Sequence, residues 1–383
     1  MPDARSENHA TPVHVIGAGP AGLAAAAALK DQGIRSVVLD RSPSVGSSWR
    51  AHYDHLRLHT TRGRSALPGL PIPRSHGRWV SRDDMVRYLE DYASHHHLEV
   101  APGVSVDRVE REDDRWVLHA NGGRRLSSPV VVVATGFHHT PRMPDLPGRD
   151  GYLGELLHSR DYREPGPYRG RDVLVIGAGN SGTEIATDLA RGGAQRVRLA
   201  VRGTPHLVRR SFLGWPAQNN AILSRRLPTG LADRLAHQYT RLTTPDLAPQ
   251  GLPRPQTGLV TRARQGALPV YDSGLIKAVR KGTVEPVRAV ESFDGDKVVL
   301  AGGERIAPEV VIAATGYEQA LEKLVGHLSV LDESGRPLVN GRRSLAGTPG
   351  LYFLGYTNPA SGALRELALD ARKIARAVAR TTS

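Results

Sequence analysis

Two glycine-rich turns carry the clearest chemistry in this sequence. The segment GAGPAG at 17–22 follows an apolar stretch at 13–16, and GAGNSG at 177–182 follows another at 173–176. Turns of the form G-x-G-x-x-G bring backbone N–H groups at the start of a helix close to a pyrophosphate. One copy alone is a weak signal. Two copies predict two dinucleotides in one polypeptide, and the natural pair is FAD with a nicotinamide nucleotide.

The residues beyond the first turn indicate which dinucleotide binds there. An acid about 20 residues past the glycines lies where ribose hydroxyls need a carboxylate acceptor. Asp40, followed by Arg41, ends the apolar strand 36–39 at that distance from the first turn. A solvated strand end would not explain the complete series of strand, glycines, helix, strand and acid. We therefore interpret Asp40 as part of an FAD ribose site.

The second turn is followed by a base instead of an acid. Strand 197–201 ends at Arg202, with Arg209 and Arg210 shortly beyond. A guanidinium pairs with the 2′-phosphate of NADP, which a carboxylate would repel. The sequence therefore favours NADPH over NADH, the alternative being that Arg202 only faces solvent in an arginine-rich protein.

Apolar strands alternating with helical patterns predict an α/β fold with two Rossmann-like dinucleotide-binding domains. We expect the FAD domain to be split into 13–168 and 285–383, and the NADPH domain to occupy 169–284 between them. A proline-rich insertion near 211–270 contains short helices, and residues 1–12 are expected to be disordered.

Further polar residues lie on predicted loops and strand ends. The stretch 53–73 is punctuated by proline and glycine, as is typical of a loop over a cofactor, and it carries His59 and Arg62. Strands 129–134 and 310–314 both close on an A-T-G turn, which brings small residues close to a nucleotide. The last helix follows Gly355, and its N-terminus would stabilise negative charge on a reduced flavin.

Composition restricts the other possibilities. The net charge is +13, but the arginines are scattered without a cationic tail, so the basic balance suits phosphate-bearing cofactors better than nucleic acid. Zero cysteine excludes a redox-active Cys-x-x-Cys pair and fits a reducing compartment.

The run 95–97 is three histidines, which diverge on a helix and predict no metal site. No stretch approaches the ~20 apolar residues of a membrane span. We expect a cytoplasmic protein without membrane contact, and the oligomeric state stays open.

The order of the motifs resembles the flavin-containing monooxygenases, and within them the YUCCA-like branch. The resemblance covers nearly the whole chain and includes the G-x-x-W-R motif at 46–50 and, most specifically, the histidine segment at 152–162. Three positions depart from the family pattern. Tyr152 replaces the opening Phe, His59 stands where the family often has an active-site Asn, and Arg62 stands for the Lys that follows.

The resemblance implies an FAD- and NADPH-dependent monooxygenase. NADPH reduces FAD, the reduced flavin adds O₂ at its C4a carbon, and the resulting C4a-peroxyflavin gives one oxygen atom to a small organic substrate. His59, Arg62 and Asn180 are expected to contact the flavin–NADP⁺ region as the catalytic group. The expected cofactor contacts are Gly17, Gly19, Pro20, Ala21, Gly22, Asp40, Arg41, Ser48, Trp49, Thr135, Gly136, His158, Gly177, Gly179, Asn180, Ser181, Gly182, Arg202, Thr315, Gly316, Gly355 and Ala363.

Two substrate classes stay open at this point. The enzyme oxidatively decarboxylates a 2-oxo acid, as the YUCCA-like branch does, or it oxygenates a soft nitrogen or sulfur atom. The alternative function is an NADPH-dependent flavin reductase or oxidase that makes H₂O₂ or feeds a redox partner. A third class is a redox sensor that binds nucleotides without turnover.

Overall fold

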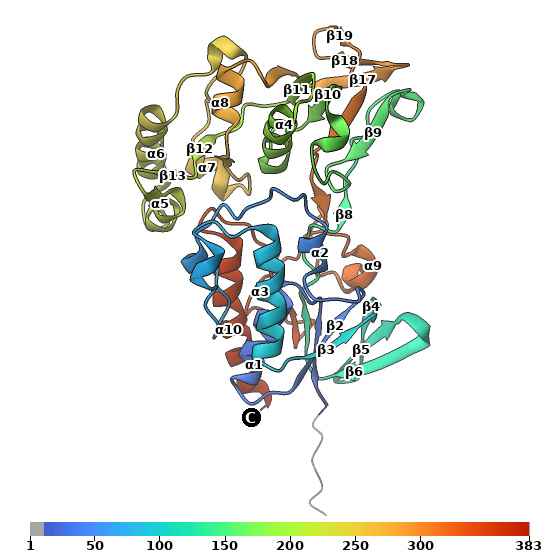
Figure 1. The fold of residues 1–383 in the computed structure, drawn as a ribbon. Coiled ribbons are helices and arrows are strands. Elements are labelled where there is room, and N and C mark those ends of the chain that lie inside the picture. Colours follow the sequence, from blue (N-terminus) through green and yellow to red (C-terminus); the bar gives the residue numbers. More distant parts are fainter. Residues whose placement is uncertain (1–10, 383) are drawn as a thin grey trace, which may run out of the picture.

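Two parallel sheets organise the chain. The computed structural model describes residues 11–382, which form two units, one above the other in Figure 1. The strand orders are β22-β7-β1-β2-β3 and β16-β11-β10-β20-β9. Every neighbouring pair in both sheets is parallel. The α/β class with two Rossmann-like units is therefore confirmed, while most of the lead-in expected at 1–12 lies outside the described residues.

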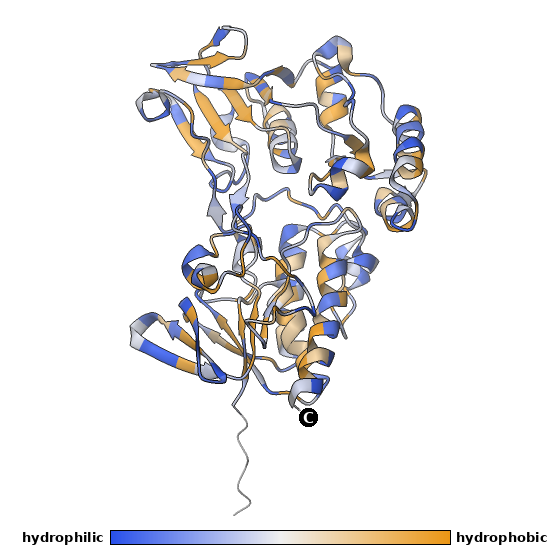
Figure 2. Cartoon of the chain, turned by 180° about the vertical axis from the view of Figure 1, so that it is seen from behind, coloured by the Kyte–Doolittle hydropathy of each residue, from blue (hydrophilic) through white to orange (hydrophobic). Residues whose placement is uncertain are grey.

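The first unit surrounds a short, largely apolar central sheet. Its strands are β1 (Val13–Ile16), β2 (Ser36–Asp40), β3 (Glu99–Pro102), β7 (Val131–Val133) and β22 (Leu351–Phe353). Because side chains alternate along a strand, Val132 packs in a core with the helices and Val131 packs in a second core on the other face. Figure 2 shows these strands as hydrophobic, as expected for a sheet that is covered on both faces.

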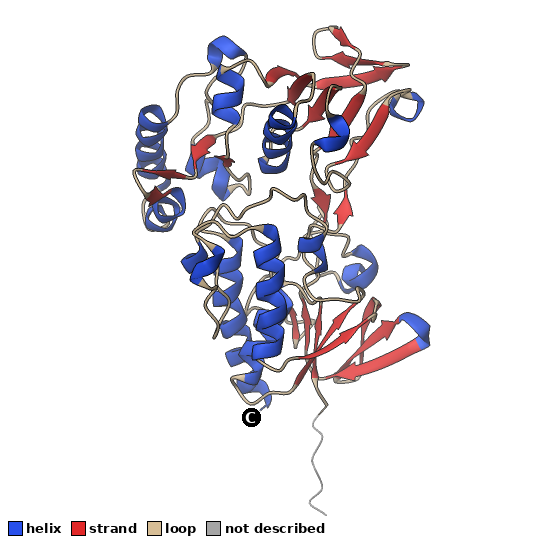
Figure 3. Ribbon diagram, viewed as in Figure 1, coloured by secondary structure: helices blue, strands red, loops and turns tan. Residues whose placement is uncertain are grey.

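Helices cover one face of this sheet and a small antiparallel sheet covers the other (Figure 3). The helical layer consists of α1 (Pro20–Lys30), α3 (Arg82–His95) and α10 (Ala363–Thr382). The antiparallel layer consists of β4 (Val106–Glu112), β5 (Arg115–Ala120) and β6 (Arg124–Ser128).

The second unit repeats this plan. Its sheet contains β9 (Glu155–His158), β10 (Asp172–Ile176), β11 (Arg196–Val201), β16 (Glu285–Arg288) and β20 (Val310–Ala313). Val175 packs toward α4 (Asn180–Gly192) and α8 (Leu275–Arg280), and Leu174 packs toward the antiparallel strands. Those strands are β17 (Val290–Asp294), β18 (Lys297–Leu300) and β19 (Arg305–Ile306).

The domain boundaries expected from the sequence do not match the sheets. Residues 155–168 and 285–313 were assigned to the FAD domain, but β9, β16 and β20 hydrogen-bond within the second sheet. The chain instead crosses between the units at β8 (Thr140–Pro141) and β21 (Tyr317–Glu318), which pair with each other. Apolar strands such as 129–134 and 310–314 look alike in sequence, and only hydrogen-bond pairing decides which sheet each joins.

The expected insertion is present and forms the left part of the upper unit in Figure 1. Its helices are α5 (Ala217–Ser224), α6 (Thr229–Thr243) and α7 (Leu259–Arg264), and α6 coincides with the helix expected there. Its strands are β12 (Leu207–Arg209), β13 (Ser211–Phe212), β14 (Trp215–Pro216) and β15 (Val270–Asp272).

The remaining elements are short. Two are α-helices, α2 (Ser47–Arg50) and α9 (Glu322–Val325), and single 3₁₀ turns lie at Arg62–Arg64, Arg74–His76, Asn121–Gly123, Arg149–Gly151, Gly166–Tyr168, Ala248–Gln250 and Gly326–Leu328. Within residues 11–382, none of the helices combines the length and the hydropathy that a membrane crossing needs.

Candidate active site between two dinucleotide cradles

The first glycine turn is an open cradle at the start of α1. A Cβ on Gly22 would lie 1.8 Å from the Gly17 carbonyl oxygen, and one on Gly17 would lie 2.5 Å from that of Ala134. Gly19 is different, because a Cβ there would meet nothing within 4 Å. Gly19 is the N-cap of α1 and no side chain caps the helix, so its first N–H groups face open space. This space fits a pyrophosphate.

The second turn repeats the arrangement at the start of α4. A Cβ on Gly182 would lie 1.9 Å from the Gly177 carbonyl oxygen, and one on Gly177 would lie 2.6 Å from that of Ala314. A Cβ on Gly179 would again meet nothing within 4 Å, and α4 likewise has no side-chain cap. Both turns therefore leave the same kind of open space for a pyrophosphate at the second glycine.

The groups expected to select each dinucleotide lie at the strand ends. The Asp40 carboxylate accepts hydrogen bonds from the backbone N–H of Ala18 at 2.5 Å and of Ser42 at 2.8 Å, so it is held beside the first turn. Arg41 and Arg202 are both exposed. Among residues 11–382, no side-chain hydrogen bond or ion pair engages Arg202, so its guanidinium is free for a ligand.

Several expected cofactor residues gather around the first turn. The N–H of Gly46 donates to the Ala18 carbonyl at 3.0 Å, which brings α2 with Ser48 and Trp49 beside the cradle. Pro20 and Ala21 form the first turn of α1. Gly355 approaches so closely that a Cβ there would lie 3.0 Å from the Ala21 Cβ.

The first A-T-G turn is tied to the C-terminal segment. The Thr135 hydroxyl hydrogen-bonds the Tyr356 hydroxyl at 2.8 Å, and Gly136 takes the left-handed φ of +73° that favours glycine. Ala363 begins α10 just beyond. Residues from several segments thus lie together at the carboxyl edge of the first sheet. Open α/β sheets bind ligands at this edge.

His158 shapes the second A-T-G turn. Its Nδ1 accepts from the Arg160 N–H at 3.1 Å, so its Nε2 carries the proton and donates to the Gly316 carbonyl at 3.0 Å. The Thr315 hydroxyl donates to the Arg142 carbonyl in the same turn. Both ring nitrogens of His158 are engaged within the protein, where they support this turn.

Two of the three expected catalytic residues are joined through Tyr271. The Asn180 amide accepts from the Tyr271 N–H at 2.8 Å, and the Tyr271 ring stacks on His59 at 5.3 Å between centroids. Ser181 follows Asn180 in the first turn of α4. Arg62 instead donates to the Ile72 carbonyl at 3.0 Å within its own loop, and its buried Nε has no partner among the described residues.

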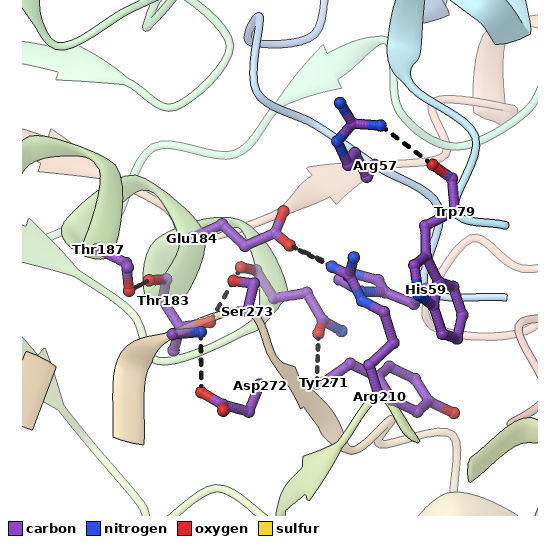
Figure 4. Close-up of polar contacts among 12 residues, drawn as sticks. Arg57, His59, Trp79, Thr183, Glu184, Thr187, Arg210, Tyr271, Asp272 and Ser273 are labelled. Atoms are coloured by element: carbon purple, nitrogen blue, oxygen red, sulfur yellow. Dashed lines mark hydrogen bonds and ion pairs between the residues drawn. The ribbon is translucent and has the colours of Figure 1, made fainter. Parts of the chain in front are cut away.

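A buried polar cluster that was not expected lies between the two units (Figure 4). The Tyr53 hydroxyl donates to Glu184 Oε2 at 2.6 Å, and Arg210 Nη2 lies 3.3 Å from Glu184 Oε1. Burial raises the pKa of Glu184, and burial beside the Arg210 charge lowers the pKa of His59 to about 3. The only sequence signal was an acid one helical turn after Asn180, next to the apolar residues Ile185 and Ala186.

A large cavity opens between the insertion and the first unit. Its volume is about 1410 Å³. Among the described residues that line it are five aromatic rings, those of Phe137, Tyr239, Tyr271, Tyr317 and Tyr356. Two exposed guanidiniums, Arg142 and Arg336, also line it, and no side-chain hydrogen bond or ion pair occupies either within the described chain. Three carboxylates, those of Glu318, Glu322 and Glu333, line it too, so the cavity offers apolar surface together with charged groups of both signs.

Comparison with known proteins identifies the family. A model of the pyridine nucleotide-disulphide oxidoreductase family matches residues 14–213. The chain is 34% identical over 349 residues to the indole-3-pyruvate monooxygenase YUCCA1 of Oryza sativa subsp. japonica, covering 90% of this chain and 86% of the relative. It is 31% identical over 366 residues to a probable indole-3-pyruvate monooxygenase, YUCCA4 of Arabidopsis thaliana, covering 94% and 88%.

Solved structures agree with this assignment. A flavin-containing monooxygenase from Stenotrophomonas maltophilia is 25% identical with a TM-score of 0.73, covering 97% of this chain and 99% of that one. A steroid monooxygenase bound to NADP shares the fold at 18% identity and a TM-score of 0.73, covering 97% and 85%. With no cysteine, the chain has no dithiol for disulfide chemistry. The chain belongs to the flavin-containing monooxygenases, in the YUCCA-like branch, and is an FAD- and NADPH-dependent monooxygenase that takes O₂ and a small-molecule substrate.

Proposed function

We propose that the enzyme oxidatively decarboxylates an aromatic 2-oxo acid. The supporting observation is the cavity, which combines five aromatic rings with the free guanidiniums of Arg142 and Arg336. The rings offer apolar surface to an aromatic side chain, and a guanidinium pairs with a carboxylate. The relatives named above act on indole-3-pyruvate, a molecule of this class.

The reaction balances with one equivalent each of NADPH and O₂. The 2-oxo acid, O₂, NADPH and a proton give the acid shortened by one carbon, CO₂, water and NADP⁺. When bound, FAD accepts the hydride of NADPH and activates O₂. The chain's own task is to bind, orient and exclude water.

We infer that the first unit holds FAD and the second holds NADPH. Gly19 and the uncapped start of α1 leave room for the FAD pyrophosphate, with Asp40 available for ribose hydroxyls. Gly179 and α4 offer the same to NADPH, and the free guanidinium of Arg202 offers a partner to the 2′-phosphate.

The experiment is turnover under ¹⁸O₂ with indole-3-pyruvate. The expected product is indole-3-acetic acid carrying one ¹⁸O atom, formed one-to-one with NADPH consumed. A thioether and a tertiary amine are tested in parallel. Oxygenation of either, without decarboxylation of the 2-oxo acid, would move the substrate class to sulfur or nitrogen. NADPH consumption that yields stoichiometric H₂O₂ with every compound would indicate an oxidase.

A further inference from the structure

The loop from Tyr53 to Thr61, here called the strap, belongs to the first unit but is fastened to the second. In Figure 1 it follows α2 in blue and runs along the underside of the upper unit. Near one end, the Asp54 N–H donates to the Arg163 carbonyl at 3.0 Å. At the other end, the Thr61 N–H donates to the side chain of buried Gln218 at 3.2 Å.

Alternate side chains of the strap reach two acids on α4. The Tyr53 hydroxyl donates to Glu184 at 2.6 Å, and His55 Nδ1 lies 3.3 Å from Asp188 Oδ1. Residues four apart share one face of a helix, and Tyr53 and His55 lie in a turn in which the Leu56 N–H donates to the Tyr53 carbonyl at 3.2 Å. Both carboxylates are only 8% exposed. The spacing of the strap therefore matches that of the acids.

A buried charge pair with two aromatic rings beside it lies at the middle of the contact between the strap and α4. Figure 4 shows Glu184 and Arg210 joined, with Trp79 and His59 beside them. The Arg210 guanidinium lies 5.3 Å from the centre of the Trp79 ring and 3.4 Å from His59 Nδ1. Both members of the pair belong to the second unit, and the first unit covers the pair with His59 and the Trp79 ring, so the contact between the units keeps the pair buried.

We propose that Tyr53, Glu184 and Arg210 are positioning residues that fix the two dinucleotide units relative to each other, and so align the nicotinamide with the flavin. Glu184 lies one turn after Asn180 in the helix that begins at the second cradle. The strap begins three residues after α2, which is held beside the first cradle. The bond between Tyr53 and Glu184 is thus a short path from one pyrophosphate site to the other. Hydride transfer depends steeply on such alignment.

The first test measures the arrangement of the units without cofactors. The chain contains no cysteine, so Ser94→Cys on α3 and Lys277→Cys on α8, both exposed positions, introduce the only two thiols for spin labels. Pulsed EPR then gives the distance distribution between the units. We expect Tyr53→Phe and Glu184→Gln to broaden or shift this distribution.

A matched control removes a hydroxyl of the same kind within one unit. Tyr92 is fully buried and donates to the Pro68 carbonyl at 2.6 Å inside the first unit. Tyr92→Phe therefore costs a similar hydrogen bond without touching the strap, and it should leave the label distance unchanged.

The second test separates alignment from binding. With FAD bound, anaerobic reduction by NADPH should be about ten- to hundredfold slower in Tyr53→Phe and Glu184→Gln. The Kd for NADPH and the FAD content should stay at parental values. The double variant should be no slower than the slower single variant, because both changes act on the same contact between Tyr53 and Glu184. These measurements do not depend on which substrate is oxidised.

Either of two results would overturn the proposal. One is a parental distance distribution together with a parental reduction rate in both variants. The other is a loss of NADPH affinity with an unchanged limiting rate, which would make Glu184 a binding residue. If Glu184→Gln does not fold, Tyr53→Phe and His55→Ala carry the test, since the His55 side chain is 66% exposed and its removal leaves the core intact.

Discussion

The two glycine turns are built alike, yet their surroundings differ. In each turn the first and third glycines are packed against backbone carbonyls, and the second faces open space. The first turn is followed by an acid that hydrogen-bonds back to it, Asp40, and the second by a free base, Arg202. The cradle is therefore set by backbone sterics, and we propose that one side chain at the end of the next strand selects the dinucleotide.

The helices that follow the turns differ as well. Residues 21–29 of α1 are all buried, and all are alanine, leucine or glycine. In α4, buried Glu184 and Asp188 interrupt the apolar surface and meet the strap. The first helix serves only its own core, whereas the second also carries the contact between the units.

The largest loss of stability is expected when the glycines that are packed against backbone carbonyls are replaced. Gly22→Ala and Gly182→Ala place a Cβ 1.8 and 1.9 Å from a carbonyl oxygen, so the backbone must move. A loss of at least about 3 kcal/mol of stability follows, enough to impair folding of either unit. Thermal unfolding and soluble yield measure it. Gly19→Ala is the control, since its Cβ meets nothing, and a normal melting curve for Gly22→Ala would contradict the packing.

The open glycines should separate the two cofactors. Gly19→Val should fold but lose its yellow colour, because a Cβ at this position meets no protein atom within 4 Å and the side chain extends into the space proposed for the pyrophosphate. Gly179→Val should keep the flavin and lose NADPH binding. Flavin absorbance and NADPH titration check both. Full FAD occupancy in Gly19→Val would remove FAD from the first unit.

Arg202→Ala tests the base of the second unit. If the guanidinium pairs with the 2′-phosphate, its loss removes about 1.5–3 kcal/mol, a ten- to hundredfold rise in the KM for NADPH. The KM for NADH and the flavin content should hardly change. Arg210 was expected to be able to substitute, but it is engaged with Glu184, which leaves Arg209 for the double variant. An unchanged preference in the double variant would place the phosphate elsewhere.

Asp40→Asn is the matching test in the first unit. The amide keeps one acceptor for the Ala18 N–H but loses the charge that favours two ribose donors. FAD affinity should fall about tenfold, roughly 1.4 kcal/mol, while NADPH binding stays constant. Equilibrium dialysis of FAD measures the change, and a parental Kd would assign Asp40 to holding the loop alone.

The smallest effect concerns pH at the junction of the units. The pKa of His59 is lowered to about 3, so between that value and its unfolded pKa the unfolded chain binds more protons. Stability should therefore fall as the pH drops from 6 to 5, by about 1 kcal/mol from this residue. His59→Gln should show a smaller shift in urea midpoint between these pH values. An equal shift in both proteins would indicate that His59 is protonated in the fold.

The sequence predicted local elements well and their assembly only in part. The strands before both turns, the strand ending at Asp40 and helix α6 formed where their patterns indicated. The domain boundaries were wrong, because β9, β16 and β20 carry no mark of the sheet that they join. His158 was predicted as a cofactor contact from its motif, and its support of a turn depends on a carbonyl 158 residues away in the chain.

By itself, the sequence determined the two cradles, the acid and the base that follow them, and the family. These features depend on residues that are close together in the chain. A glycine turn, for example, requires only its own glycines and the strand that precedes it. Only the tertiary structure decided which strands make each unit and how the units meet. Tyr53 and Glu184 are 131 residues apart, and each alone is an ordinary buried residue. Their contact exists because two folded units bring a loop and a helix face together, and local patterns do not encode that arrangement.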